Sequence, residues 1–217
     1  PVRGADFRVS AIDAAHPPLS LRRTYTLAAP FYDSFLTTAT QGPRRRNLAA
    51  LAEKTSQDVL LVGVGTGLDL PHLPSQHRYV GLDLTPAMLR RARRRPSPAR
   101  VAYVQADAQA LPFCDHSFDG AVLHLILAVV PDPGRCLAEA ARVVRPGGEL
   151  LVFDKFLRPG ERTLWKRVLN PLTRRLATRL DVVFEDLMAQ VPALDRHHDE
   201  PALAGGWFRL IRLRRLA

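Results

Sequence analysis

Short apolar runs alternate with amphipathic stretches along the middle of this chain, and their lengths predict strands and helices in turn. The clearest run is 59–62, in which two of the four apolar residues are β-branched. Such a run is typical of a strand that is buried on both faces of a parallel sheet. Repeated strand–helix units predict an α/β fold with a doubly wound, mostly parallel sheet and right-handed crossovers. By the same criteria, strands are predicted at 59–63, 78–82, 101–105, 119–125 and 149–155, and helices near 68–72, 86–95 and 133–144.

The two ends of the chain depart from this alternation. Residues 1–20 have no periodicity and are expected to form a loosely held arm. Residues 22–52 have a helical pattern that is interrupted at Pro30 and restarts near Pro43, where proline suits the first turn of a helix. After Asp154, helices are predicted over 164–180 and 183–190, and a final strand is predicted at 207–213 with a short partner near 194–200.

Local signals predict where two of the central helices begin and end. Thr85-Pro86 predicts an N-cap followed by proline at the first helical position. Pro131-Asp132-Pro133 opens the next helix, and the Arg-Pro-Gly-Gly sequence at 145–148 closes it before a strand.

Three glycines at alternate positions, Gly63, Gly65 and Gly67, follow the first predicted strand. Because glycine has no Cβ, such a loop can turn sharply and approach a ligand closely. Asp83 comes twenty residues after Gly63, at the end of the second predicted strand, where a carboxylate can accept hydrogen bonds from both hydroxyls of a ribose. The spacing predicts a nucleoside site at the carboxyl edge of the sheet. The alternative is a glycine-rich loop that merely connects a strand to a helix.

The glycine spacing also indicates which nucleoside is bound. A dinucleotide site needs G-x-G-x-x-G, and Leu68 stands where its third glycine would be. The carboxylate of Asp69 would repel a diphosphate. A ligand with an adenosine end and no phosphate fits better, and S-adenosylmethionine is the obvious candidate.

Polar residues also follow the later predicted strands. Asp107 can accept a hydrogen bond from an adenine amino group while the Ala108 N–H donates to a ring nitrogen; the alternative is that Asp107 forms a turn or an N-cap. His124 ends the fourth strand, where it can contact the methionyl part or substrate, or deprotonate a nucleophile. The alternative is a buried histidine that is satisfied by a backbone carbonyl. Asp154, beside Lys155, is the second candidate base.

Composition narrows the class of protein. A chain of 217 residues is long enough for one domain with a large core. No apolar run approaches the ~20 residues of a membrane-spanning helix, and residues 1–20 lack the apolar core of a signal peptide, so we expect a cytoplasmic protein. Cys114 and Cys136 have no metal-ligand spacing and are expected to be thiols, with one disulfide left open. No metal site is predicted.

The net charge of +10 is carried mainly by arginine, which clusters at 44–46, 90–95, 174–175 and 212–215. These clusters would attract the phosphates of lipid headgroups or of RNA, and solvated helix faces are the alternative explanation.

Five motifs occur in order, at 62–67, 81–85, 106–113, 117–119 and 144–148. Together they resemble class I S-adenosylmethionine-dependent methyltransferases. The chain is similar to the branch that holds ubiquinone/menaquinone biosynthesis methyltransferases and bacterial phosphatidylethanolamine N-methyltransferases. The match covers about residues 22–156. The resemblance implies a Rossmann-like sheet of seven strands with an antiparallel last strand, which suits 207–213.

The resemblance also implies a cofactor site for S-adenosyl-L-methionine. The N-terminal segment resembles the part of this branch that lies over the cofactor, where tyrosines can cap the sulfonium; ordinary helix packing is the alternative. The residues expected to bind the cofactor are Tyr25, Tyr32, Gly63, Gly65, Thr66, Gly67, Asp83, Leu84, Asp107, Ala108 and His124.

We expect a single domain over 1–217. It would comprise an N-terminal arm with cap helices (1–52), a cofactor-binding core (53–155), a lid insert (156–190) and C-terminal strands (191–217). The insert mixes large apolar residues with arginines. This mixture suits a lid that contacts an anionic membrane and admits a lipid or a prenylated quinone; the alternative is an ordinary helix packed on the sheet.

The sequence therefore predicts S-adenosylmethionine-dependent methyl transfer to a small-molecule or lipid acceptor. An RNA methyltransferase would explain the charge, but no RNA-binding module is evident and the fourth strand lacks an Asn-Pro-Pro-Tyr type motif. A nicotinamide oxidoreductase is disfavoured by the missing third glycine. A non-catalytic S-adenosylmethionine-binding protein remains an alternative, because pocket residues report binding rather than turnover. The acceptor atom and the oligomeric state stay open at this stage.

Overall fold

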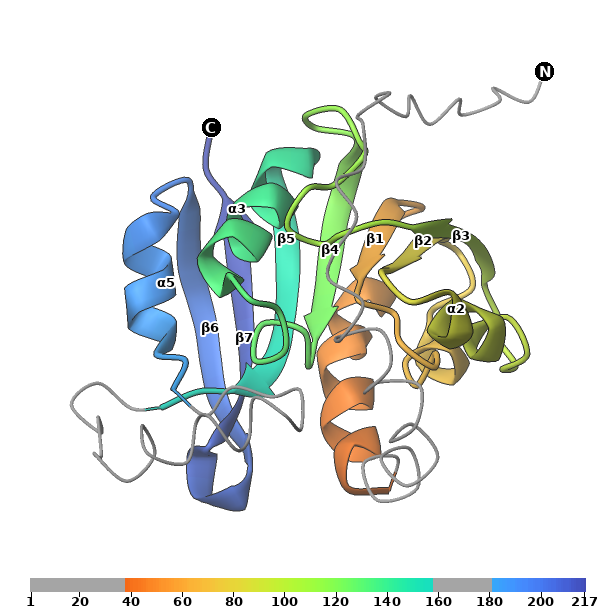
Figure 1. The fold of residues 1–217 in the computed structure, drawn as a ribbon, viewed down its shortest axis with the longest axis horizontal. Coiled ribbons are helices and arrows are strands. Elements are labelled where there is room, and N and C mark those ends of the chain that lie inside the picture. Colours follow the sequence, from red (N-terminus) through yellow and green to blue (C-terminus); the bar gives the residue numbers. More distant parts are fainter. Residues whose placement is uncertain (1–37, 158–180) are drawn as a thin grey trace.

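A computed structural model describes residues 38–157 and 181–217. Its strands form one seven-stranded sheet in the order β3-β2-β1-β4-β5-β7-β6 (Figure 1). A helix over 38–52 precedes the sheet. The other elements are β1 (Asp58–Val62), the 3₁₀ helix η1 (Leu70–His72), β2 (Arg78–Asp83), α2 (Pro86–Ala92), β3 (Arg100–Gln105), β4 (Phe118–His124), α3 (Pro133–Val143), β5 (Val144–Lys155), α5 (Phe184–Gln190), β6 (Leu194–Leu203), η2 (Ala204–Gly206) and β7 (Phe208–Arg215).

The sheet is parallel from β1 to β5, as the alternation of strands and helices predicts. The last strand, β7, pairs antiparallel with both β5 and β6. The expected doubly wound α/β sheet, with seven strands and an antiparallel last strand, is therefore confirmed.

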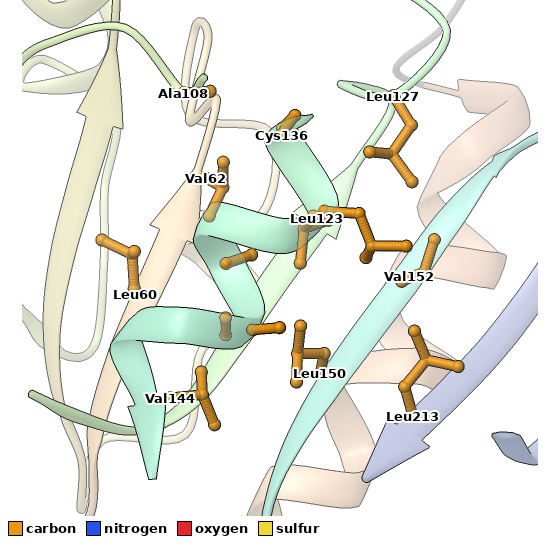
Figure 2. Packing of buried hydrophobic residues seen from close by; sticks show 14 of the residues in the cluster. Leu60, Val62, Ala108, Leu123, Leu127, Cys136, Val144, Leu150, Val152 and Leu213 are labelled. Carbon is orange, nitrogen blue, oxygen red and sulfur yellow. The ribbon is translucent and has the colours of Figure 1, made fainter. Parts of the chain in front are cut away.

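Both faces of the central strands are buried, which explains why their sequences are continuous apolar runs rather than alternating ones. In β1, Leu60 and Val62 face the cluster that contains residues of α3 and α5, whereas Val59 and Leu61 face the cluster that contains residues of helix 38–52 and α2. Figure 2 shows the first of these clusters, with α3 lying across the strands. The core is thus two layers separated by the sheet.

Two local predictions differ from the structure, and a third is confirmed without a side-chain hydrogen bond. Residue 38 is already helical, so Pro43 lies inside a helix and not in its first turn. The fifth strand begins at Val144, not at 149, because Val144 pairs with Phe118 before a shift in register. Thr85 occupies the N-cap of α2 and Pro86 its first turn, as predicted, but the threonine side chain makes no capping hydrogen bond.

Two other local predictions are confirmed. The Asp132 side chain accepts a hydrogen bond from the Arg135 N–H at 3.0 Å and so caps α3, with Pro133 in the first turn. Cys114 and Cys136 are not joined in a disulfide, and the first is exposed and the second buried.

The parallel register brings the ends of the first three strands together. Val62 is paired with Leu82 across β1 and β2, and Asp83 is paired with Gln105 across β2 and β3. The loops that follow these strands therefore leave the sheet at one edge, which is where open α/β sheets bind their ligands.

The core makes a direct prediction. Leu123, on β4, is fully buried in the cluster of Figure 2. We expect Leu123→Ala to lower the free energy of unfolding by about 3 kcal/mol, because it removes apolar contacts and leaves a cavity. Urea denaturation followed by circular dichroism measures this. Leu216, which is 44% exposed, is the matched control, and Leu216→Ala should change stability by less than about 0.5 kcal/mol. Equal losses in the two variants would contradict the described core.

Candidate functional site

The loop after β1 turns through its three glycines, all with positive φ: 70° at Gly63, 55° at Gly65 and 82° at Gly67. A Cβ on Gly63 would lie 2.6 Å from Cδ1 of Ile126, and one on Gly67 would lie 2.6 Å from Cδ1 of Leu70. Within 38–157 and 181–217, the only atom that a Cβ on Gly65 would meet is the Gly63 carbonyl oxygen, at 3.9 Å. Packing therefore explains two of the glycines. At Gly65 the positive φ favours glycine, and the open space leaves room for a ligand.

Asp83 joins this loop to the end of β2. Its Oδ2 accepts a hydrogen bond from the Gly65 N–H at 2.9 Å, and its Oδ1 accepts one from the Thr85 N–H at 2.8 Å. Burial raises the pKa of Asp83, and the two backbone N–H groups oppose that rise. Each carboxylate oxygen keeps a lone pair beyond these bonds. The side chain is therefore placed both to shape the glycine loop and to accept a ligand's hydroxyl.

The loop after β3 lies beside that of β2. The Ala106 N–H donates to the Asp83 carbonyl at 3.2 Å, so the two loops are hydrogen bonded to each other. Asp107 Oδ1 accepts the Gln109 N–H at 2.8 Å, which is the turn-forming bond weighed as an alternative for this residue. The next residue, Ala108, is buried. Asp83, which ends β2, and Asp107, two residues after β3, thus lie at the same edge, as predicted.

Thr66 and Leu84 contribute backbone contacts at this edge. The Thr66 carbonyl accepts a hydrogen bond from Nε of Arg95, just beyond α2, at 3.0 Å. The Leu84 carbonyl accepts one from Nε2 of Gln105 at 3.2 Å. These bonds tie the first two loops to elements that are themselves packed on the sheet.

Asp154, near the end of β5, is buried with its side chain turned to the segment that follows β4. Oδ2 accepts the Ala128 N–H at 3.1 Å, and Oδ1 accepts the N–H of Lys155 at 2.8 Å. Burial raises the pKa of Asp154 to about 6, against these backbone hydrogen bonds. The segment itself begins at Leu125, whose φ of 58° is rare for a residue other than glycine. The carboxylate therefore holds a strained turn next to the glycine loop.

His124 ends β4 with its ring buried and both nitrogens occupied. Nδ1 lies 2.8 Å from Oδ1 of Asp69, and Nε2 lies 3.1 Å from Nδ2 of Asn47. The alternative prediction, a buried histidine whose ring is hydrogen bonded within the protein, agrees with this arrangement. Its partners, however, are side chains and not a backbone carbonyl. The ring reaches the edge where the strands end, as predicted, and it does so inside a polar network.

Asp69 is the centre of that network. Its Oδ1 also accepts a hydrogen bond from Nη1 of Arg44 at 2.8 Å. Burial by itself raises the pKa of Asp69, but the charges and hydrogen bonds of Arg44 and His124 outweigh burial and hold it well below its usual value. From the sequence, this carboxylate was expected only to repel a diphosphate. Arg44 was expected, as part of the cluster at 44–46, to attract phosphates or to lie on a solvated helix face, but it is buried and paired with Asp69. Asn47 was missed, although its spacing with Arg44, Leu48 and Leu51 places polar side chains on the buried stripe of a helix.

Several predicted features lie outside the described residues. These are Tyr25 and Tyr32 of the N-terminal segment and the helix predicted over 164–180 in the insert. The described residues on either side of 158–180 are adjacent, because the Leu157 N–H donates to the Val182 carbonyl at 2.8 Å.

Comparisons with known proteins agree with this geometry. The family model described as a methyltransferase domain matches residues 60–152. The chain is 34% identical over 189 residues to a phosphatidylethanolamine N-methyltransferase of Cereibacter sphaeroides, covering 85% of this chain and 92% of that protein. It is 37% identical over 132 residues to a demethylmenaquinone methyltransferase of Renibacterium salmoninarum, covering 58% of this chain and 54% of that protein.

A solved structure shows the same fold. The geranyl diphosphate C-methyltransferase of Streptomyces coelicolor, in complex with Mg²⁺, geranyl diphosphate and S-adenosyl-L-homocysteine, superposes with a TM-score of 0.65 at 15% identity, over 81% of each chain. The family resemblance found in the sequence is thus confirmed. This chain belongs to the class I S-adenosylmethionine-dependent methyltransferases, in the branch of the phosphatidylethanolamine and demethylmenaquinone methyltransferases.

Proposed function

We propose that this methyltransferase transfers the methyl group of S-adenosylmethionine to the neutral amine of a lipid or of another small molecule. The relative that carries most weight is the phosphatidylethanolamine N-methyltransferase, because the chain aligns with 92% of its length. The chain spans only about half of the demethylmenaquinone methyltransferase, which gives weaker support for a quinone acceptor.

The residues at the carboxyl edge suit this cofactor. Gly65 leaves open space where a side chain would block a ligand, and Asp83 has remaining acceptor capacity beside it. We assign Asp83 to the ribose hydroxyls and Asp107 with Ala108 to adenine. The glycine loop with Thr66, and Leu84 after β2, complete the proposed site, and Tyr25 and Tyr32 are proposed to cap it.

The candidate bases favour an acceptor that needs no base. The cofactor supplies an electrophilic methyl group on a sulfonium, and its leaving thioether needs no proton, so the protein mainly aligns the reactants and excludes water. Both nitrogens of His124 are engaged, and both oxygens of Asp154 hold backbone N–H groups. A phenol or carbon acid would need His124 to give up one of its partners, or would have to reach a spare lone pair of Asp154, whose residue is only 1% exposed. A neutral amine already has the lone pair that attacks the methyl group, so it needs no base. The engagement of both His124 nitrogens is therefore the observation that carries the proposal.

We further propose that 1–217 is one domain in which 156–190 is a lid. Two observations support an insertion at 158–180. Leu157 and Val182 are hydrogen bonded to each other, and the sheet continues from β5 to β7 and from β7 to β6. Neither 38–157 nor 181–217 contains a helix with both the length and the apolar character needed to cross a bilayer. Independently of that, we propose that a lipid acceptor reaches the site from a membrane surface that the basic insert contacts.

The cofactor assignment predicts the effect of Asp83→Asn. The amide replaces one acceptor oxygen with a donor that faces a backbone N–H, and it removes the charge that strengthens hydrogen bonds to the ribose. We expect S-adenosylhomocysteine to bind at least about tenfold more weakly, measured by isothermal titration calorimetry. Asp115→Asn, at an exposed residue paired with Arg142, is the matched control and should leave affinity unchanged. Wild-type affinity in Asp83→Asn would refute the ribose assignment.

The buried carboxylate of Asp154 predicts a pH-dependent stability difference. Its folded pKa of about 6 lies above the ordinary value of 3.8, so the folded state binds the proton more tightly. The wild type should therefore gain stability relative to Asp154→Asn as the pH falls through 6. Between about pH 7.5 and about pH 5 the gain should be roughly 1 kcal/mol.

Urea midpoints of the two proteins at several pH values measure this difference. Other titrating groups, Asp69 among them, are shared by both proteins and cancel in the comparison. A difference that does not vary with pH, or that shrinks on acidification, would contradict the raised pKa.

The proposed acceptor class predicts where labelled methyl goes. The purified protein is incubated with methyl-labelled S-adenosylmethionine and separate vesicles of phosphatidylethanolamine or phosphatidylglycerol, which differ in the headgroup amine. We expect label in the first lipid as an N-methyl product and none in the second. Asp83→Asn should lower the incorporation. A parallel incubation uses an extract of host cells in place of the vesicles. Label recovered there only in a quinone, a fatty acid or RNA would overturn the amine proposal and identify the acceptor class.

A further inference from the structure

The network around Asp69 joins three separate parts of the chain. Arg44 and Asn47 come from helix 38–52, Asp69 follows the glycine loop, and His124 ends β4. Arg44 also donates from Nε to Oγ1 of Thr40 at 3.1 Å, one turn earlier in the helix. All five side chains belong to buried residues. If one side chain of such a network is displaced, the others are left buried without their hydrogen bonds. Because this is costly, the network holds its side chains in one arrangement.

The network fixes the tautomer of His124. The Asn47 amide nitrogen has two hydrogens, and its two acceptors are the Val152 carbonyl at 3.2 Å and Nε2 of His124 at 3.1 Å. The carbonyl can only accept, which places the amide nitrogen on this side of Asn47. Nε2 of His124 therefore accepts, and the hydrogen of the ring lies on Nδ1, where it is donated to Asp69.

The glycine loop is consequently held at two points. Near its middle, the Gly65 N–H is bound by Asp83, and two residues beyond Gly67 the Asp69 carboxylate is bound by Arg44 and His124. The same histidine stands immediately before Leu125 and Ile126, and Ile126 packs on Gly63. A displacement of the imidazole would thus reach the loop both through Asp69 and through the turn after β4.

We propose that His124 is a positioning residue, which holds the cofactor loop through its Nδ1–H bond to Asp69 rather than by removing a proton from the acceptor. This inference rests on the proposed cofactor site. Asn47 and Arg44 complete the unit: Asn47 selects the tautomer that can donate, and Arg44 keeps the carboxylate of Asp69 ionised so that it accepts. The observations that carry it are the two occupied ring nitrogens and the shared Oδ1 of Asp69.

Two substitutions at His124 separate its two hydrogen bonds. The amide of His124→Asn lies where Nδ1 lies and can still donate to Asp69, whereas the longer His124→Gln carries its amide to the position of Nε2 and loses that donor. Calorimetric titration with S-adenosylhomocysteine should show about tenfold weaker binding for His124→Gln, the loss of one net hydrogen bond to a charged group. His124→Asn should restore affinity to within about threefold of the wild type.

Thermal unfolding of each variant separates this role from a structural one. A histidine that only stabilises the fold would lower the melting temperature of both variants and leave the affinity of the folded protein equal in both. Equal affinities for His124→Gln and the wild type would overturn the positioning role. Asp83→Asn, titrated in parallel, tests the cofactor site itself. If that site is misplaced, Asp83→Asn should also bind S-adenosylhomocysteine with wild-type affinity.

A double-mutant cycle gives an independent test that includes Asp69. If His124 acts through Asp69, the effects of Asp69→Asn and His124→Gln on affinity should not add, and the double variant should bind no more weakly than the worse single variant. Multiplying losses would show that the two side chains act separately, which overturns the proposal. The cycle also applies at reduced temperature, where a destabilised variant stays folded.

Discussion

The parallel pairing of β1 with β2 and β4 is the constraint on which the rest of the structure depends. It brings the ends of these buried strands to one edge of the sheet. The glycine loop, Asp83 and His124 therefore lie side by side, although they are far apart in the sequence. The Gly65 N–H to Asp83 bond is the local result, because the left-handed turn at Gly65 directs a backbone donor at the end of the neighbouring strand. A slip of one residue in this register would exchange the two buried faces of β1 and separate these groups.

Much of the fold follows from the sequence because its central strands are buried on both sides. The run at 59–62 admits no polar residue, since Leu60 and Val62 contact one helical layer and Val59 and Leu61 contact the other. Asp83 and Asp107 were predicted at the site edge for a related reason. Polar residues directly after such strands lie at the carboxyl edge, where ligands bind, whatever the loops do afterwards.

The parts that sequence reasoning missed depend on contacts between distant residues. Asp69 is 25 residues from Arg44 and 55 from His124, so no local pattern assigns it a partner. The buried face of helix 38–52 carried a signal in its polar positions, but their partners depend on how the helix packs on the sheet. The early start of β5 is of the same kind, because Val144 becomes a strand residue by pairing with Phe118.

Three of the acidic side chains around this edge, Asp69, Asp83 and Asp154, differ in what balances their charge, and that difference bears on the roles proposed for them. Asp69 has a guanidinium and an imidazole, so its pKa is lowered and its oxygen is committed to protein partners. Asp83 has backbone N–H groups, and Asp154 has backbone N–H groups together with the charge of Lys155; these do not offset burial, and both pKa values are raised.

A carboxylate held by cationic partners is costly to disturb, which suits a fixed joint between elements. A carboxylate held by dipoles alone gains when a ligand adds further donors, because these stabilise the charged form that burial disfavours. This reasoning supports the proposed assignment of Asp83 to the ligand and of Asp69 to the scaffold, although both lie at the same edge of the sheet. Asp154 differs from both, because the charge of Lys155 opposes the rise in its pKa and one of its backbone partners, the Ala128 N–H, belongs to the segment after β4.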